Sequence, residues 1–113
     1  MNPVSLIRAT TLGLAVIVMT TFLSPMVSAA DVKIGKGERI VFLGDSITAA
    51  GVRPKGYVTQ VKNAIAANHS ELKVEIIGAG ISGHKVPDCQ KRLQRDVLSK
   101  KPTIVVIYIG IND

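Results

Sequence analysis

Cysteine and histidine are scarce in this chain of 113 residues, which contains only Cys89, His69 and His84. A single cysteine excludes an intrachain disulfide, a two-cysteine redox motif and a cysteine-rich zinc site. The two histidines do not complete a cluster of metal-ligating residues, so we expect no metal and no cofactor. Cys89 is expected to pack as a small hydrophobe.

A recognisable nucleic-acid-binding module is also lacking, although the formal net charge is +6. Several basic residues lie on or just after one predicted helix: Lys91, Arg92, Arg95, Lys100 and Lys101. Such a group could attract acidic polymers. Cations near a helix C-terminus are equally typical of a solvated helix face. We favour the solvated face and expect no nucleic-acid partner.

The first thirty residues carry one charge, at Arg8, followed by an apolar run over residues 12–23 and small residues up to Ala30. This pattern is typical of an export signal cleaved after Ala29 or Ala30. The run is shorter than the roughly 20 apolar residues that span a bilayer. We therefore predict a signal peptide over residues 1–30, no stable membrane anchor after its removal, and a periplasmic or secreted protein formed by residues 31–113.

Hydrophobic patterning predicts alternating strands and helices in residues 31–113. Strands are expected at 39–43, 72–77 and 103–109, and helices at 57–67 and 87–99. This order is typical of an open α/β sheet, in which right-handed crossover helices join parallel strands and the site lies at the strands' carboxyl ends. Gly44, Gly78 and Gly110 are expected at those ends.

Two of these elements allow more detailed predictions. In the last helix, Cys89, Leu93 and Val97 form the expected inward stripe, whereas we expect the charged residues to lie largely outside it: Lys91, Arg92, Arg95 and Asp96. The second strand alternates charged and apolar residues, which suggests an edge position. The last strand is uncharged, as in strands covered on both faces, so we expect further elements to cover it.

Residues suited to serine chemistry occur at the predicted strand ends. Ser46 closely follows the first strand, where a turn can expose its hydroxyl. A serine needs a base to remove its proton, and the oxyanion formed on attack needs preorganised donors. The backbone N–H groups of Ser46 and Gly83 and the side-chain amide of Asn112 could converge on one oxygen.

Three sequence blocks together resemble the GDSL, or SGNH, hydrolase family: Gly44-Asp45-Ser46-Ile47-Thr48, Gly80-Ile81-Ser82-Gly83 and Gly110-Ile111-Asn112-Asp113. The resemblance implies a three-layer α/β/α flavodoxin-like fold, present here incompletely as the N-terminal part of an esterase domain. It also implies that Ser46 is the nucleophile and that Gly83 and Asn112 contribute to the oxyanion hole.

The chain departs from the family pattern at two places. Many members have asparagine where Gly78 stands, and its loss is expected to weaken hydrogen bonding in a turn. The family's catalytic histidine and aspartate lie in a D-x-x-H block, which these 113 residues do not contain. We expect Asp45 and Asp113 to fix turns rather than act as the triad acid. His84 is expected to line the substrate site, and His69 to lie at the surface.

These features predict an exported carboxylic ester hydrolase that forms an acyl-enzyme at Ser46. Its substrate would be a small-molecule or glycan ester, with acetylated carbohydrate as one candidate and lysophospholipids or thioesters as others. The alternative is a truncated, non-catalytic fragment that lacks the His/Asp pair. A nucleotide-binding domain is disfavoured because residues 78–83 have the glycine spacing G-x-G-x-x-G, but its acidic partner does not follow at the end of the next predicted strand.

Overall fold

The computed structural model describes residues 33–113. The signal peptide predicted over residues 1–30 lies outside the described residues. In order, the elements are β1 (Arg39–Gly44), α1 (Ser46–Gly51), α2 (Tyr57–Asn68), η1 (Ser70–Leu72), β2 (Glu75–Gly80), α3 (Val86–Asp96), η2 (Leu98–Lys100) and β3 (Ile104–Tyr108). Within this range no helix is both long enough and apolar enough to cross a membrane.

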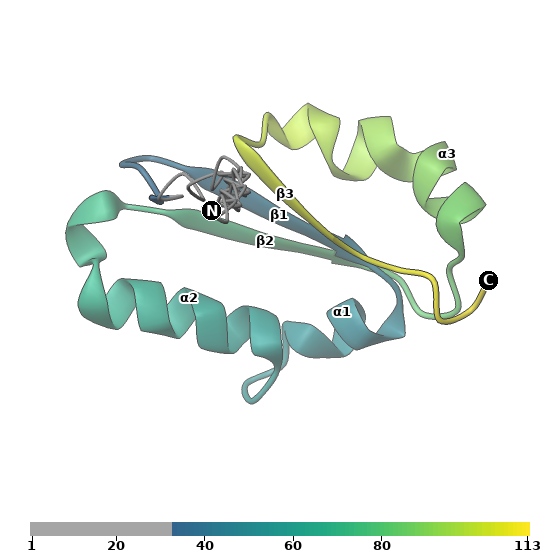
Figure 1. Ribbon diagram of the computed structural model, residues 1–113, viewed down its shortest axis with the longest axis horizontal. Coiled ribbons are helices and arrows are strands. Elements are labelled where there is room, and N and C mark those ends of the chain that lie inside the picture. The colour runs from purple at the N-terminus through teal and green to yellow at the C-terminus, as the bar shows by residue number, and fades with distance from the viewer. Residues whose placement is uncertain (1–32) are drawn as a thin grey trace, which may run out of the picture. The chain divides into compact units, whose positions relative to one another are not determined.

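The three strands are parallel and lie in the order β2-β1-β3. Helices α1 and α2 cover one face of the sheet, and α3 lies on the other (Figure 1). The layers are therefore α/β/α, as predicted. Among the described strands β2 lies at an edge of the sheet, as predicted.

Strand β1 supplies the core of both layers because its side chains alternate between the two faces. Val41 and Leu43 pack with Cys89 and Val97 on the α3 side. Ile40 and Phe42 pack with Val58 on the α2 side. All of these side chains are buried, and each large one contributes about 1.5–3 kcal/mol to folding. The inward stripe predicted for α3 is confirmed.

Strand β3 has only β1 as its neighbour among the described strands, and much of its apolar surface is exposed. Its exposed side chains are those of Val105, Val106, Ile107 and Tyr108. The second neighbour expected for so apolar a strand is therefore not among the described residues.

Strand β2 lies three residues further along the chain than the sequence predicted. Residues 70–72 form a short 3₁₀ turn that ends at Lys73 in a left-handed conformation, with φ of 50°. At the other end, Gly78 pairs with Phe42 and Gly80 with Gly44, so pairing continues past the predicted end. The expectation of a turn at Gly78 is wrong, because that residue lies inside the strand and Gly80 ends it.

Helix α1 was not predicted. It has only six residues, which is too short to show a helical period, and residues 49–51 carry small side chains. Helix α3 starts at Val86, so Pro87 occupies its second position rather than the predicted first.

Candidate active site

Ser46 is the first residue of α1 and is exposed at the carboxyl end of β1. The adjacent Asp45 is buried and caps the helix: its Oδ1 accepts a hydrogen bond from the backbone N–H of Ile47 at 2.9 Å. An aspartate at this position satisfies an otherwise unpaired helical N–H. Asp45 therefore fixes the turn, as expected, and the cap sets the direction in which Ser46 leaves the strand.

The second block packs directly against the first. The backbone N–H of Ile81 donates to the carbonyl of Gly44 at 3.1 Å. At Gly80, an added Cβ would lie 2.1 Å from the backbone nitrogen of Ala49. Only glycine permits so close an approach of β2 to the first turn of α1.

Gly83 lies in the exposed loop after β2, with φ of +76°. An added Cβ there would meet nothing within 4 Å, so glycine is required by backbone conformation rather than by space. The following residue, His84, donates its backbone N–H to the Ile81 carbonyl at 3.3 Å. The loop is therefore a tight turn that presents the Gly83 backbone at the end of the sheet.

The third block is tied to this loop by two side chains. Asn112 Nδ2 donates to the His84 carbonyl at 3.0 Å. Asp113 Oδ1 accepts from the backbone N–H of Val86, at the start of α3, at 3.0 Å. Because an amide has two N–H donors, this bond leaves Asn112 one further hydrogen. Asp113 fixes local structure, as expected. The structure thus brings all three blocks together at one edge of the sheet.

Arg92 is buried, and the prediction that it lies outside the packed face of α3 is wrong. Its side chain is 4% exposed. Nη2 donates to the Gly44 carbonyl and Nη1 to the Ala79 carbonyl, both at 2.8 Å. Arg92 lies three residues after Cys89, so the inward surface of α3 is wider than the predicted stripe. In the sequence, the burial of Arg92 is indicated only by Asp96, four residues later, because an aspartate at this spacing can pair with an arginine on the same helix.

Asp96 lies between two guanidinium groups. Arg95 donates to it through Nε at 2.6 Å and through Nη2 at 3.0 Å, and Arg92 Nη1 donates at 3.2 Å. Hydrogen bonds from Arg95 are the largest cause that lowers the pKa of Asp96 from 3.8 to about 2. The hydrogen bond from Arg92 also lowers this pKa, whereas burial of the carboxylate opposes the shift.

This pKa predicts a loss of stability in acid. Because the folded-state pKa lies below the ordinary value, the contribution of Asp96 is fully present above about pH 4 and is lost as the pH falls through about 2. This contribution is at most about 2–3 kcal/mol, since one pKa unit corresponds to about 1.4 kcal/mol. In Asp96→Asn, the free energy of unfolding measured by urea titration should depend less on pH across this range. Coincident pH profiles of Asp96→Asn and the wild-type protein would contradict the prediction.

Nδ1 of His84 is not free to act as a base, because its lone pair is taken by a hydrogen bond. Its Nδ1 accepts a hydrogen bond from Arg92 Nε at 3.1 Å, and its side chain is partly exposed beside Gly83. Its predicted role in lining the substrate site stays a prediction. The predicted surface position of His69 is confirmed, since it is exposed after the last residue of α2.

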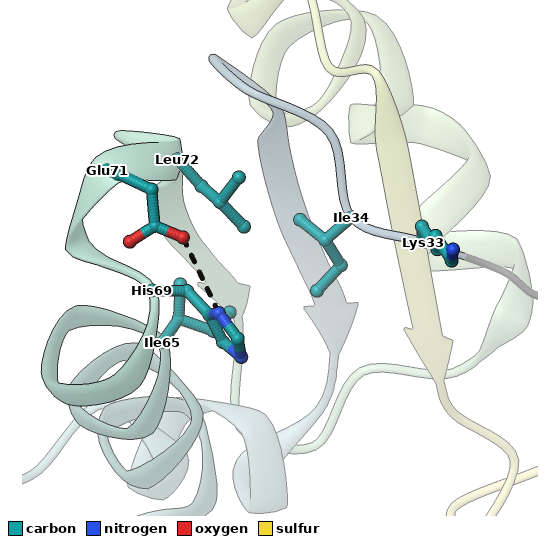
Figure 2. Close-up of a pocket in the computed structure, with 6 residues that line it drawn as sticks. All are labelled: Lys33, Ile34, Ile65, His69, Glu71 and Leu72. Atoms are coloured by element: carbon teal, nitrogen blue, oxygen red, sulfur yellow. Dashed lines mark ion pairs between the residues drawn. The ribbon is translucent and has the colours of Figure 1, made fainter.

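A pocket of about 360 Å³ adjoins His69, away from the joined blocks. Figure 2 shows its lining, which includes Lys33 and Ile34 before β1 and Leu72 before β2. His69 Nδ1 lies 3.6 Å from Glu71 Oε1. The pocket therefore lies at the amino ends of the strands, opposite to Ser46. Within residues 33–113, three or more His, Cys, Asp or Glu side chains nowhere gather closely enough to hold a metal ion.

Comparison with known proteins gives one family. Residues 42–113 match the sequence model of the GDSL-like Lipase/Acylhydrolase family. An acetylxylan esterase from Geobacillus stearothermophilus is 42% identical over 92 residues, which cover 72% of this chain and 42% of that protein. An uncharacterised lipoprotein from Bacillus subtilis, YqeF, is 33% identical over 87 residues, which cover 70% of this chain and 34% of that protein.

Solved structures agree with this result. The crystal structure of the G. stearothermophilus acetylxylan esterase Axe2 matches with a TM-score of 0.66 at 42% identity, over 71% of this chain and 42% of that chain. The acetyl xylan esterase AlAXEase matches with a TM-score of 0.62 at 44% identity, over 66% of this chain and 37% of that chain. The predicted fold class is confirmed, and the chain spans about two fifths of the length of the first of these relatives.

Proposed function

Because the chain belongs to the GDSL-like lipase/acylhydrolase family, we propose that it is the N-terminal part of an exported serine esterase that forms an acyl-enzyme at Ser46. One observation carries the proposal. The exposed Ser46 stands at the carboxyl edge of the sheet, where hydrogen bonds join its turn to the loops of Gly83 and Asn112. This is the edge at which open α/β sheets place their sites.

In the proposed reaction, Ser46 Oγ attacks the ester carbonyl carbon and its proton passes to a base. The carbonyl oxygen becomes an oxyanion, which the backbone N–H groups of Ser46 and Gly83 and the second amide hydrogen of Asn112 stabilise. The intermediate then expels the alcohol, which takes up a proton, and leaves an acyl group on Ser46. Water hydrolyses that ester and restores the serine.

Acetylated carbohydrate is the substrate class that we propose. Two of the relatives are named as acetylxylan esterases. The proposal is tested by incubating the full-length protein with acetylated xylan and measuring acetate. We expect acetate release with multiple turnovers, and slower hydrolysis of a lysophospholipid. Preference for the lysophospholipid would contradict the substrate assignment.

The alternative proposal concerns the 113 residues in isolation, which we expect to be nearly inactive. Two observations support this expectation: His84 Nδ1 accepts a hydrogen bond from Arg92, and His69 adjoins a pocket at the opposite ends of the strands. Removal of a triad histidine lowers kcat by several orders of magnitude. The same acetate assay tests this alternative. If the isolated 113 residues release acetate as fast as the full-length protein, the alternative is refuted.

Export completes the proposal. The charged start, apolar run and small residues of segment 1–30 support a signal peptide and a periplasmic or secreted esterase. Sequencing of the mature N-terminus should find Ala30 or Asp31 as the first residue. A mature protein that retains Met1 would contradict export by this route.

A further inference from the structure

The buried guanidinium of Arg92 connects three segments of the proposed site. Nη2 donates to the carbonyl of Gly44, two residues before Ser46, and Nη1 donates to the carbonyl of Ala79 in the last part of β2. Nε donates to Nδ1 of His84 in the loop that follows β2. One side chain on α3 therefore holds the ends of both strands and the adjoining loop.

Only arginine has the geometry for these bonds. A guanidinium presents five N–H donors in a rigid plane, whereas a lysine ammonium offers three donors from one atom. The three acceptors receive bonds from three different nitrogens, at 2.8, 2.8 and 3.1 Å. The Arg92 charge is paired by Asp96 at 3.2 Å. A lysine could pair with Asp96 but could not reproduce all three bonds.

His84 transmits this constraint to Gly83. Its ring is held by Arg92, and its backbone carbonyl is held by Asn112 Nδ2 at 3.0 Å. Because Nδ1 accepts a hydrogen bond, the neutral ring carries its proton at Nε2. The residue next to Gly83 is thus fixed at both its side chain and its backbone, which limits rotation of the exposed turn.

We propose that Arg92 is the positioning residue of the oxyanion hole, which aligns the turn of Ser46 with the loop of Gly83 through Gly44, Ala79 and His84. This inference rests on the proposed function. In the proposed reaction, Arg92 does not contact any reacting atom. Loss of Arg92 is expected to lower kcat. An oxyanion-hole donor displaced by about 1 Å can lower the rate by about 100-fold without preventing substrate binding.

Kinetics of the full-length protein test this role. In Arg92→Lys, kcat for ester hydrolysis should fall at least about tenfold while KM changes less than about twofold. In Arg92→Ala, millimolar guanidinium should restore part of kcat. The matched control is Arg95→Lys and Arg95→Ala, because Arg95 is on the same helix and also bonds to Asp96 but is 73% exposed. Both controls should retain kcat and show no rescue.

The result that would overturn the proposal is a folded Arg92→Lys protein with unchanged kcat. If Arg92→Ala fails to fold, Arg92→Lys decides the question. A loss of thermal stability in Arg92→Lys with normal kcat would indicate a purely structural residue and would equally overturn it.

A second readout does not depend on esterase activity. The ¹⁵N chemical shifts of the His84 ring should report the Nε2–H form in the wild-type protein and in Arg95→Lys, and a mixture of forms in Arg92→Lys. Ring shifts unchanged in Arg92→Lys would overturn the transmission through His84. If full activity survives Ser46→Ala, the proposed function fails, while the shifts still report whether Arg92 holds His84.

Discussion

Replacing Ser46 by alanine in the full-length protein is expected to lower kcat/KM for a nitrophenyl ester by at least about four orders of magnitude. In serine hydrolases, loss of the nucleophile removes the covalent route and leaves only substrate binding and the oxyanion hole. Ser46 begins α1 and lies at the surface, and its backbone is fixed by the Asp45 cap. The substitution should therefore leave the fold and the melting temperature almost unchanged.

The matched control for this experiment is Ser70→Ala. Ser70 is also exposed but lies in η1, which precedes β2 and so belongs to the amino side of the sheet. Its activity should equal that of the wild-type protein. Substantial turnover in a folded Ser46→Ala protein would remove the basis for an acyl-enzyme at this position.

Replacing Asn112 by alanine is expected to lower kcat by about 10²–10³, the usual effect of losing one oxyanion-hole donor. The change removes the amide hydrogen assigned to the oxyanion and also the bond to the His84 carbonyl. Both losses act on the transition state, so KM should change little. Steady-state kinetics of the full-length protein measure the two parameters.

Asn68→Ala controls for the loss of an exposed amide. Asn68 donates to the Ala64 carbonyl within its own helix, so its removal should leave kcat unchanged. A second comparison is Asp113→Ala, which removes the bond to Val86 but no proposed donor. If Asp113→Ala lowers kcat as much as Asn112→Ala, positioning of the loop rather than an oxyanion donor would account for the effect.

Periodic elements were predictable from the sequence because burial selects residues at fixed spacing. Uncharged strands such as 104–108 come from packing within the sheet, and so does the repeat of Cys89, Leu93 and Val97 along α3 and its C-cap. The alternation of charged and apolar residues in β2 reflects its position at an edge of the sheet formed by the described strands.

Features without a period were missed. Helix α1 depends on the Asp45 cap, and an Asp followed by Ser reads equally well as an ordinary turn. The end of β2 was misplaced because glycine is normally read as a strand terminator. Here Gly80 stays in the strand, since its missing side chain lets the strand pack against the backbone of α1.

The most consequential error concerned Arg92. A charged residue beside an apolar stripe is normally solvated, so periodicity places it on the outer face. Burial of an arginine side chain becomes favourable only when its guanidinium N–H groups form hydrogen bonds and its charge is paired. Those partners are the carbonyls of Gly44 and Ala79, the ring of His84 and the carboxylate of Asp96. Asp96 is on the same helix as Arg92, but the other three partners lie on different segments and meet Arg92 only after folding.

The central claim is that Ser46 is the nucleophile of an ester hydrolase, and covalent labelling tests it most directly. The full-length protein is treated with a fluorophosphonate, digested and analysed by mass spectrometry. We predict one phosphonylated site, at Ser46, formed in step with loss of ester hydrolysis and absent in Ser46→Ala. Complete loss of hydrolysis with the label on another residue, and Ser46 unmodified, would contradict the account.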